Sequence, residues 1–114
     1  MDTKQLKDAI VKVLQDKKGL DIRVVDLDGR TIIADYFIIA TGTSAPHLRA
    51  LAEYIESEIE KSKLRPLRKE GLREGGWIVL DYGSIIVHLF NRESRDYYCL
   101  EKLWGNKDNI AIIE

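Results

Sequence analysis

Three polar side chains stand inside the apolar and aromatic stretch between Trp77 and Trp104, and they are the residues of this sequence best suited to chemistry. They are Asp81, His88 and Glu101. Carboxylates accept hydrogen bonds from lysine and arginine, and an imidazole can exchange a proton near neutral pH. Two interpretations of His88 stay open. It is either a histidine at the edge of the core, hydrogen-bonded to backbone or to a carboxylate, or part of a partner-binding or catalytic surface.

The elements that position these residues are predicted from the spacing of apolar side chains. The runs 77–82 and 85–90 are rich in Val, Ile and aromatic residues, and the glycine-serine dipeptide between them is typical of a β-hairpin. Alternation along the second run places His88 on one face with Ile86 and Phe90. After the hairpin the period becomes helical, which predicts a short aromatic helix. Its shared face consists of Tyr97, Leu100, Glu101 and Trp104.

Length and composition indicate one globular domain. The 114 residues are enough for one buried core and too few for two domains, and 45% apolar with 32% charged residues argues against disorder. No apolar run approaches the roughly 20 residues of a membrane span. The first residues resemble neither a signal nor a transit peptide, so we expect a cytoplasmic protein. The single cysteine, Cys99, excludes an internal disulfide and a multi-cysteine zinc site, and we expect no metal and no cofactor.

The net charge of −1 gives no general attraction to nucleic acid, but the charges are unevenly distributed. Residues 53–60 hold four acids and no base, whereas residues 61–73 hold six bases and one acid. This basic segment is either a solvated rim or a contact to RNA phosphates, which would weaken with salt. The candidate RNA contacts are Arg65, Arg68, Lys69 and Arg73.

The first half of the chain predicts a helix followed by two strands. Residues 3–18 carry apolar side chains at helical spacing, with Thr3 as the expected N-cap and Gly19 as the stop. Residues 21–27 are β-branched and end in a tight-turn dipeptide. The run 36–41 is almost continuously apolar, which is typical of a central strand covered on both faces.

A second helix is predicted directly after that strand. Gly42 allows a sharp exit, Ser44 is a good N-cap, and Pro46 is tolerated in the first turn. The buried stripe is expected at Leu48, Leu51, Ala52, Ile55 and Ile59. The turn either serves strand-to-helix geometry alone or holds an anion at the helix N-terminus. It lacks the patterns of a P-loop and of a dinucleotide fingerprint, and His47 is expected to be a surface residue.

These elements predict an α/β fold, specifically an α+β mixed sheet in two layers with the helices mainly on one face. A helix between strands indicates one right-handed crossover in an otherwise antiparallel sheet. One short edge strand fits between residues 67 and 76. The uncovered face of the sheet would be available to a partner. We place the domain at residues 1–104 and leave 105–114 as a tail of unknown role, whose apolar end either docks on the domain or contacts another chain.

Three segments in order, 35–52, 77–90 and 94–104, resemble the RsfS/Iojap family of ribosomal silencing factors. The resemblance implies a protein that binds the large ribosomal subunit through ribosomal protein fourteen. There it would sterically block joining of the small subunit and lower translation, particularly under nutrient limitation. It also implies a domain related to the nucleotidyltransferase fold without its catalytic acids, and a homodimer when the protein is free.

The family pattern falls on sixteen positions of this chain by the resemblance. They are Asp35, Thr41, Gly42, Thr43, Ser44, His47, Trp77, Asp81, Gly83, His88, Phe90, Arg95, Tyr98, Leu100, Glu101 and Trp104. One departure is Ser84, which stands where the family commonly has an acid after the hairpin glycine. The tail 105–114 lies outside the shared pattern.

The competing hypothesis is a nucleotidyltransferase-related enzyme. That chemistry needs paired carboxylates to hold divalent metals, and the strand after the second helix offers only Asp81, with Val79 two residues earlier. No serine lies in a nucleophile motif. The residue pattern therefore favours a binding protein over an enzyme.

We predict a partner-binding surface of rigid aromatic side chains, which are enriched at interface hot spots, with carboxylate acceptors for a basic ribosomal protein. Its members are Trp77, Asp81, Tyr82, Gly83, His88, Tyr97, Glu101, Lys102 and Trp104. Tyr98 and Leu103 are expected to hold the last helix to the sheet instead.

Overall fold

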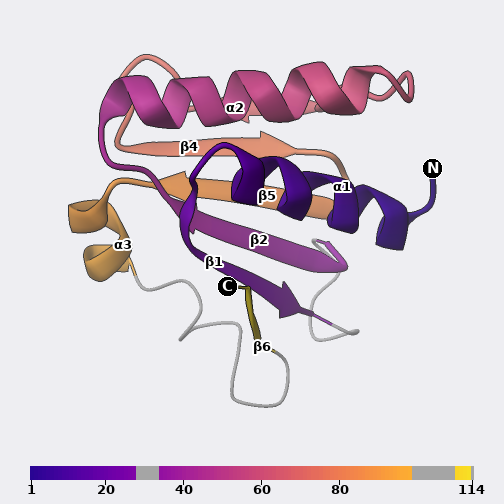
Figure 1. Cartoon of the computed structure of the whole chain (residues 1–114), viewed down its shortest axis with the longest axis horizontal. Coiled ribbons are helices and arrows are strands. Elements are labelled where there is room, and N and C mark those ends of the chain that lie inside the picture. Colours follow the sequence, from indigo (N-terminus) through magenta and orange to yellow (C-terminus); the bar gives the residue numbers. More distant parts are fainter. Residues whose placement is uncertain (28–33, 99–109, 114) are drawn as a thin grey trace.

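A computed structural model describes residues 1–27, 34–98 and 110–113 of the chain (Figure 1). Within these ranges three helices and one six-stranded sheet are present, in the strand order β3-β4-β5-β2-β1-β6. The elements are α1 (Thr3–Asp16), β1 (Leu20–Asp26), β2 (Tyr36–Thr41), α2 (Ala45–Glu60), β3 (Arg68–Glu70), β4 (Trp77–Asp81), β5 (Ile85–Phe90), α3 (Arg92–Tyr98) and β6 (Ile110–Ile113). Only the β2–β5 pair is parallel among the described strands. The mixed sheet with a single crossover is therefore confirmed.

Strand β2 lies inside the sheet and is covered on both faces, as its apolar run predicts. Ile38 and Ala40 point into the larger core, which α1 and α2 cover. Phe37 and Ile39 point to the opposite face and belong to a second apolar cluster. All four side chains are buried. The continuous apolar run thus reflects two cores, one on each side of the strand.

Helix α1 begins and ends differently from the prediction. Its N-cap is Asp2 and not Thr3: the Asp2 carboxylate accepts from the Gln5 N–H at 2.7 Å, and the Gln5 side chain accepts from the Asp2 N–H at 3.0 Å. This reciprocal pair is a capping box, which a threonine inside the first turn cannot form. At the other end Lys18, and not Gly19, takes the left-handed conformation, with φ of 65°.

Helix α2 is organised as predicted. The Ser44 hydroxyl accepts from the His47 N–H at 3.2 Å, so Ser44 is the N-cap. The predicted stripe is buried, including Leu48 and Leu51. Gly42 is required by packing: a Cβ there would lie 2.7 Å from Leu48 Cδ2. The turn before α2 thus has a clear structural reason for its small residues.

The second face of the sheet is buried along its centre, so the expectation of an uncovered face is wrong there. The buried side chains of this face are Val25, Leu27, Ala34, Phe37, Ile39, Ile86 and Phe90. Trp77 and Val79 of β4 pack against the cluster and stay partly exposed. The accessible part of this face therefore lies at its β3–β4 margin.

Beyond β5, the end of the chain docks on the sheet, and the last helix begins earlier than predicted. Strand β6 pairs antiparallel with β1 and forms one edge of the sheet, so the docked alternative holds for residues 110–113. Helix α3 begins five residues before Tyr97, at Arg92. Of the predicted helix 97–104, residues 99–104 lie outside the described ranges, as do 105–109 of the tail.

Candidate partner-binding surface

The indole of Trp77 is held in place by two neighbours on β5. Its Nε1–H donates to His88 Nδ1 at 3.1 Å, and its ring stacks on Phe90 with centroids 5.1 Å apart. The register places Trp77 opposite Phe90, because β4 and β5 form the predicted antiparallel hairpin. Trp77 is half-buried. Its exposed edge is thus a rigid apolar surface.

His88 is a buried member of the second face, only 7% exposed, and sits between Trp77, Phe37 and Phe90. Burial lowers the pKa of His88 from 6.5 to about 4. The ring is therefore neutral at pH 7, and because Nδ1 accepts from the indole, its proton resides on Nε2. Nε2 is buried and has no hydrogen-bond partner in the described part of the chain. The core-edge interpretation of His88 is correct, but its partner is an indole and not backbone or a carboxylate.

Asp81 and Gly83 shape the turn of the hairpin. Asp81 Oδ1 accepts from the Gly83 N–H at 2.8 Å, and the Tyr82 N–H donates to the Ile85 carbonyl at 2.9 Å. Gly83 has φ of +88°, a conformation that glycine adopts without strain. Asp81 Oδ2 lies 3.9 Å from Arg68 Nη2. The Asp81 carboxylate therefore already has two internal contacts.

Tyr82 lies on the side of α2, apart from the face of Trp77. It is half-buried against the larger core, and its hydroxyl oxygen is buried without a hydrogen-bond partner among the described residues. Burial, and then the carboxylate of Glu56, raise the pKa of the Tyr82 hydroxyl. Tyr82 thus does not share a face with Trp77.

The structure therefore brings together only part of the predicted surface. Trp77 and Asp81 alternate with Val79 along β4, and these three residues pair with Phe90, Ile86 and His88 of β5. Trp77, Asp81 and His88 therefore share the face of the second cluster. Trp77 and Asp81 lie about 13 Å apart along the strand, at about 3.3 Å per residue. Tyr97 belongs to α3, whereas Glu101, Lys102 and Trp104 lie outside the described ranges.

The basic segment is largely paired with acids. Lys69 Nζ lies 3.1 Å from Glu56, and Arg65 Nη2 lies 3.0 Å from Glu60, both carboxylates of α2. Arg68 lies 3.8 Å from Glu70. The remaining candidate, Arg73, has an exposed position after β3. The acid-rich helix thus offsets part of the positive potential, and an RNA contact here stays a prediction.

Two residues outside the predicted partner-binding surface stand out in the structure. Leu67 is 77% exposed beside the hairpin turn, at 3.4 Å from where a Cβ on Gly83 would lie. In the sequence, exposure of Leu67 could have been inferred from its position as an apolar residue within a charged segment. Arg95 is 7% exposed, and its Nη1–H donates to Thr41 Oγ1 at 2.9 Å. Nothing local marks an arginine as buried, since the contact joins residues far apart in the chain.

The structure was also searched for metal sites and membrane spans. In residues 1–27, 34–98 and 110–113, no three His, Cys, Asp or Glu side chains gather in a way that could hold a metal ion. No helix within the same ranges is long and apolar enough to span a bilayer.

Comparison with known proteins gives matches along the full chain. The family described as "Ribosomal silencing factor during starvation" matches residues 1–114, so the match includes the tail that the sequence analysis left outside the shared pattern. Ribosomal silencing factor RsfS of Bacillus subtilis is 34% identical over 93% of this chain and 90% of its own length. The protein of the same name from Haemophilus influenzae is 38% identical over 88% and 98%. A crystal structure of a Chromobacterium violaceum protein superposes with a TM-score of 0.89 at 31% identity, covering 99% of this chain and 95% of that one.

Proposed function

Because the chain belongs to the RsfS family of ribosomal silencing factors, we propose that it represses translation by binding the large ribosomal subunit through ribosomal protein fourteen. There it prevents the small subunit from joining. The full-length family match carries this proposal. Relatives carry the name ribosomal silencing factor, and a protein of 13.1 kDa needs only to occupy space at the subunit interface to act this way.

The surface proposed for this contact is the β4 margin of the sheet, with Trp77 as its main apolar contact. The indole is fixed by His88 and Phe90, so little side-chain freedom is lost when a partner covers it. Half-buried tryptophans held in this way are typical hot-spot residues. Asp81 and the exposed Leu67 lie toward the turn end of the same hairpin. An apolar contact with polar groups around it fits a protein partner.

The local chemistry of Asp81 supports binding over catalysis. Its carboxylate is used by the Gly83 N–H, and the neighbour on the same face is Val79. A nucleotidyltransferase needs paired carboxylates at such a strand. The relationship to that fold remains a prediction from the resemblance, to which the parallel β2–β5 pair adds support.

The decisive experiment combines subunit joining with subunit binding. Purified subunits are mixed with and without the protein and separated on a sucrose gradient. We expect the protein to lower the fraction of joined ribosomes and to sediment with the large subunit. Unchanged joining at saturating protein, or absence from the large-subunit fractions, contradicts the proposed function.

Substitutions test the surface separately from the function. We expect Trp77→Ala to abolish co-sedimentation and Trp77→Phe to weaken it, because phenylalanine keeps a ring but loses the donor to His88. Tyr54→Ala is the matched control, since Tyr54 is an aromatic residue, 46% exposed, on α2. Circular dichroism confirms folding of each variant. A folded Trp77→Ala protein that sediments like the wild type removes this surface from the proposal.

Three further parts of the proposal have their own measurements. The proposal includes a cytoplasmic location, which fractionation of cells tests. Homodimerisation of the free protein is tested by sedimentation equilibrium. A peripheral contact of Arg65, Arg68, Lys69 and Arg73 with ribosomal RNA predicts that their alanine variants lower the slope of log affinity against log salt.

A further inference from the structure

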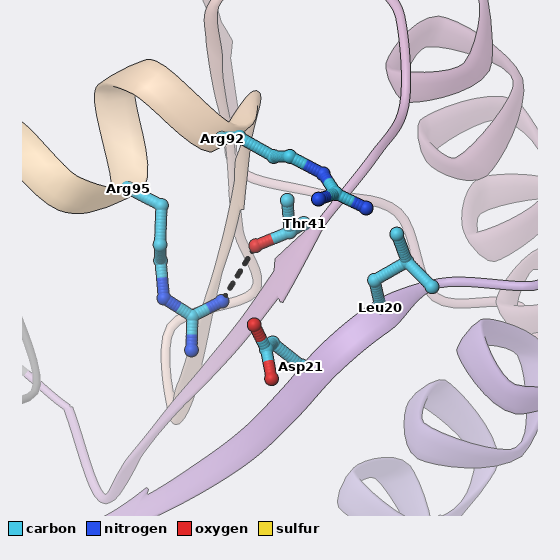
Figure 2. A pocket seen from close by; sticks show the side chains of 5 residues that line it. All are labelled: Leu20, Asp21, Thr41, Arg92 and Arg95. Carbon is cyan, nitrogen blue, oxygen red and sulfur yellow. Dashed lines mark hydrogen bonds between the residues drawn. The ribbon is translucent and has the colours of Figure 1, made fainter.

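A cavity of about 360 Å³ lies at the end of the sheet where β2 and β5 finish. It is lined by Leu20, Asp21, Thr41, Arg92 and Arg95 (Figure 2). Thr41 ends β2, and α3 follows directly on β5, so the cavity lies at the carboxyl ends of the two parallel strands. In sheets with parallel strands this is the edge where small ligands usually bind, and the volume is within the usual range for such sites.

Two arginines of α3 line this cavity, with Thr41 between their guanidinium groups (Figure 2). Arg92 and Arg95 are three residues apart, which puts them on one face of the helix. The Arg95 guanidinium is buried and oriented by its hydrogen bond to Thr41, whereas Arg92 is exposed at the rim (Figure 2). Guanidinium groups donate in a planar fork that matches phosphate oxygens. This wall of the cavity therefore favours a phosphate group.

The opposite wall carries a carboxylate in an uncommon backbone conformation. Asp21 has φ of 47°, at a point where the β1–β2 register shifts between Leu20 and Arg23. The irregularity turns the Asp21 side chain into the cavity, toward Thr41 (Figure 2). Non-glycine residues in this region cost energy and are found disproportionately at binding sites.

We propose that this cavity binds a small nucleoside phosphate. The phosphate lies between the guanidinium groups of Arg92 and Arg95, and a ribose hydroxyl donates to the Asp21 carboxylate, which would repel a bare phosphate. Leu20 supplies the apolar wall. The site needs no metal and no reaction, and it does not depend on binding of the large subunit.

Titration calorimetry on the full chain tests the proposal with ADP, GDP, inorganic pyrophosphate and adenosine as separate probes. We expect saturable binding of at least one nucleotide that is tighter than pyrophosphate and adenosine. Arg92→Ala is expected to weaken it roughly tenfold through loss of a charge-assisted contact, and Arg92→Lys less. Asp21→Asn is expected to reduce the preference for nucleotide over pyrophosphate. Lys4→Ala, an exposed cation on α1, is the matched control and should bind normally.

Several outcomes overturn the proposal. No saturable binding of either nucleotide at millimolar concentration removes the site. Equal weakening by Arg92→Ala and Lys4→Ala reduces it to general charge attraction. Pyrophosphate binding as tight as nucleotide binding, unchanged by Asp21→Asn, removes the nucleoside part. Because Arg92 is exposed, its variant should remain folded, and co-sedimentation of Arg92→Ala with large subunits separates this result from the proposed function.

Discussion

Two regions of this molecule that meet solvent use their polar groups in opposite ways. On the β4–β5 hairpin, the polar groups form hydrogen bonds within the hairpin itself. The indole of Trp77 donates to His88, and the carboxylate of Asp81 accepts from the Gly83 N–H. Along α2 and β3, by contrast, Lys69 and Arg65 reach acids through exposed ion pairs. The first arrangement depends on burial and geometry, and the second is screened by salt.

This contrast indicates which region can discriminate between partners. An exposed ion pair can exchange its carboxylate for another at little cost, so the charged segment adjusts to many surfaces. The hairpin presents a fixed shape, because Trp77 cannot move without breaking its contacts to His88 and Phe90. We therefore expect specificity to reside on the hairpin and salt-dependent affinity on the charged segment.

The largest expected effect comes from removing the support of the indole. Phe90 is fully buried and stacks on Trp77. Phe90→Ala should lower the free energy of unfolding by about 3–5 kcal/mol, the usual cost of deleting a buried aromatic ring. Urea unfolding measures this loss. A loss below about 1 kcal/mol would show that the hairpin face is not a packed core.

The next effect is a dependence of stability on pH. The pKa of His88 is about 4 in the folded chain and near 6.5 when unfolded, so the unfolded state binds the proton first as the pH falls. Stability is complete above about pH 6.5 and decreases toward pH 4. The total is about 3 kcal/mol at 1.36 kcal/mol per pKa unit.

Unfolding curves at several pH values measure this decrease. The matched variant His88→Gln has no ionisable ring, so the wild type should lose more stability than the variant between pH 6.5 and 4. Carboxylates titrate in both proteins and cancel in the difference. Parallel curves for the two proteins would contradict the buried, neutral state of His88.

A smaller effect is expected at the turn. Gly83→Ala forces a side chain into φ of +88° and should cost about 1–2 kcal/mol. Gly76 is the matched control, because it has an ordinary φ and a Cβ there would meet Asn91 at 3.5 Å. Comparing the two variants by thermal unfolding isolates the conformational cost. Equal losses at both positions would show that conformation is not what requires glycine at 83.

The smallest effect is expected on the charged side. Lys69→Ala removes the pair between the exposed Lys69 and the partly buried Glu56 and should change stability by less than about 1 kcal/mol. The difference from the wild type should shrink in high salt. A loss that is larger and independent of salt would mean that this segment is as rigid as the hairpin, which would remove the contrast between the two regions.

Elements defined by local spacing could be predicted from the sequence. The run 36–41, the hairpin and the buried stripe of α2 each follow from a period of apolar residues, and Ser44 follows from its position before that stripe. The prediction was wrong at both ends of α1, because a neighbouring residue takes the predicted role. Asp2 is the N-cap in place of Thr3, and Lys18 adopts the left-handed conformation in place of Gly19.

The parts of the site that depend on distant contacts could not be predicted. The Trp77–His88 hydrogen bond requires the hairpin register, and the burial of Arg95 requires β2 and α3 to meet at Thr41. Tyr82 follows Asp81 directly, yet it faces the opposite side, because neighbouring strand residues alternate. The orientation of Asp21 depends on a register shift in β1, which the residue pattern does not predict.

The strand order has a consequence for how this protein is made. The two innermost strands, β2 and β5, are connected through α2, β3 and β4. The first strand, β1, pairs with the edge strand β6. Such distant pairings close large loops and slow folding. During synthesis, one edge of β1 therefore has no strand partner until Ile110–Ile113 has emerged from the ribosome. The sheet is therefore completed only after β6 has left the ribosome that synthesises the chain.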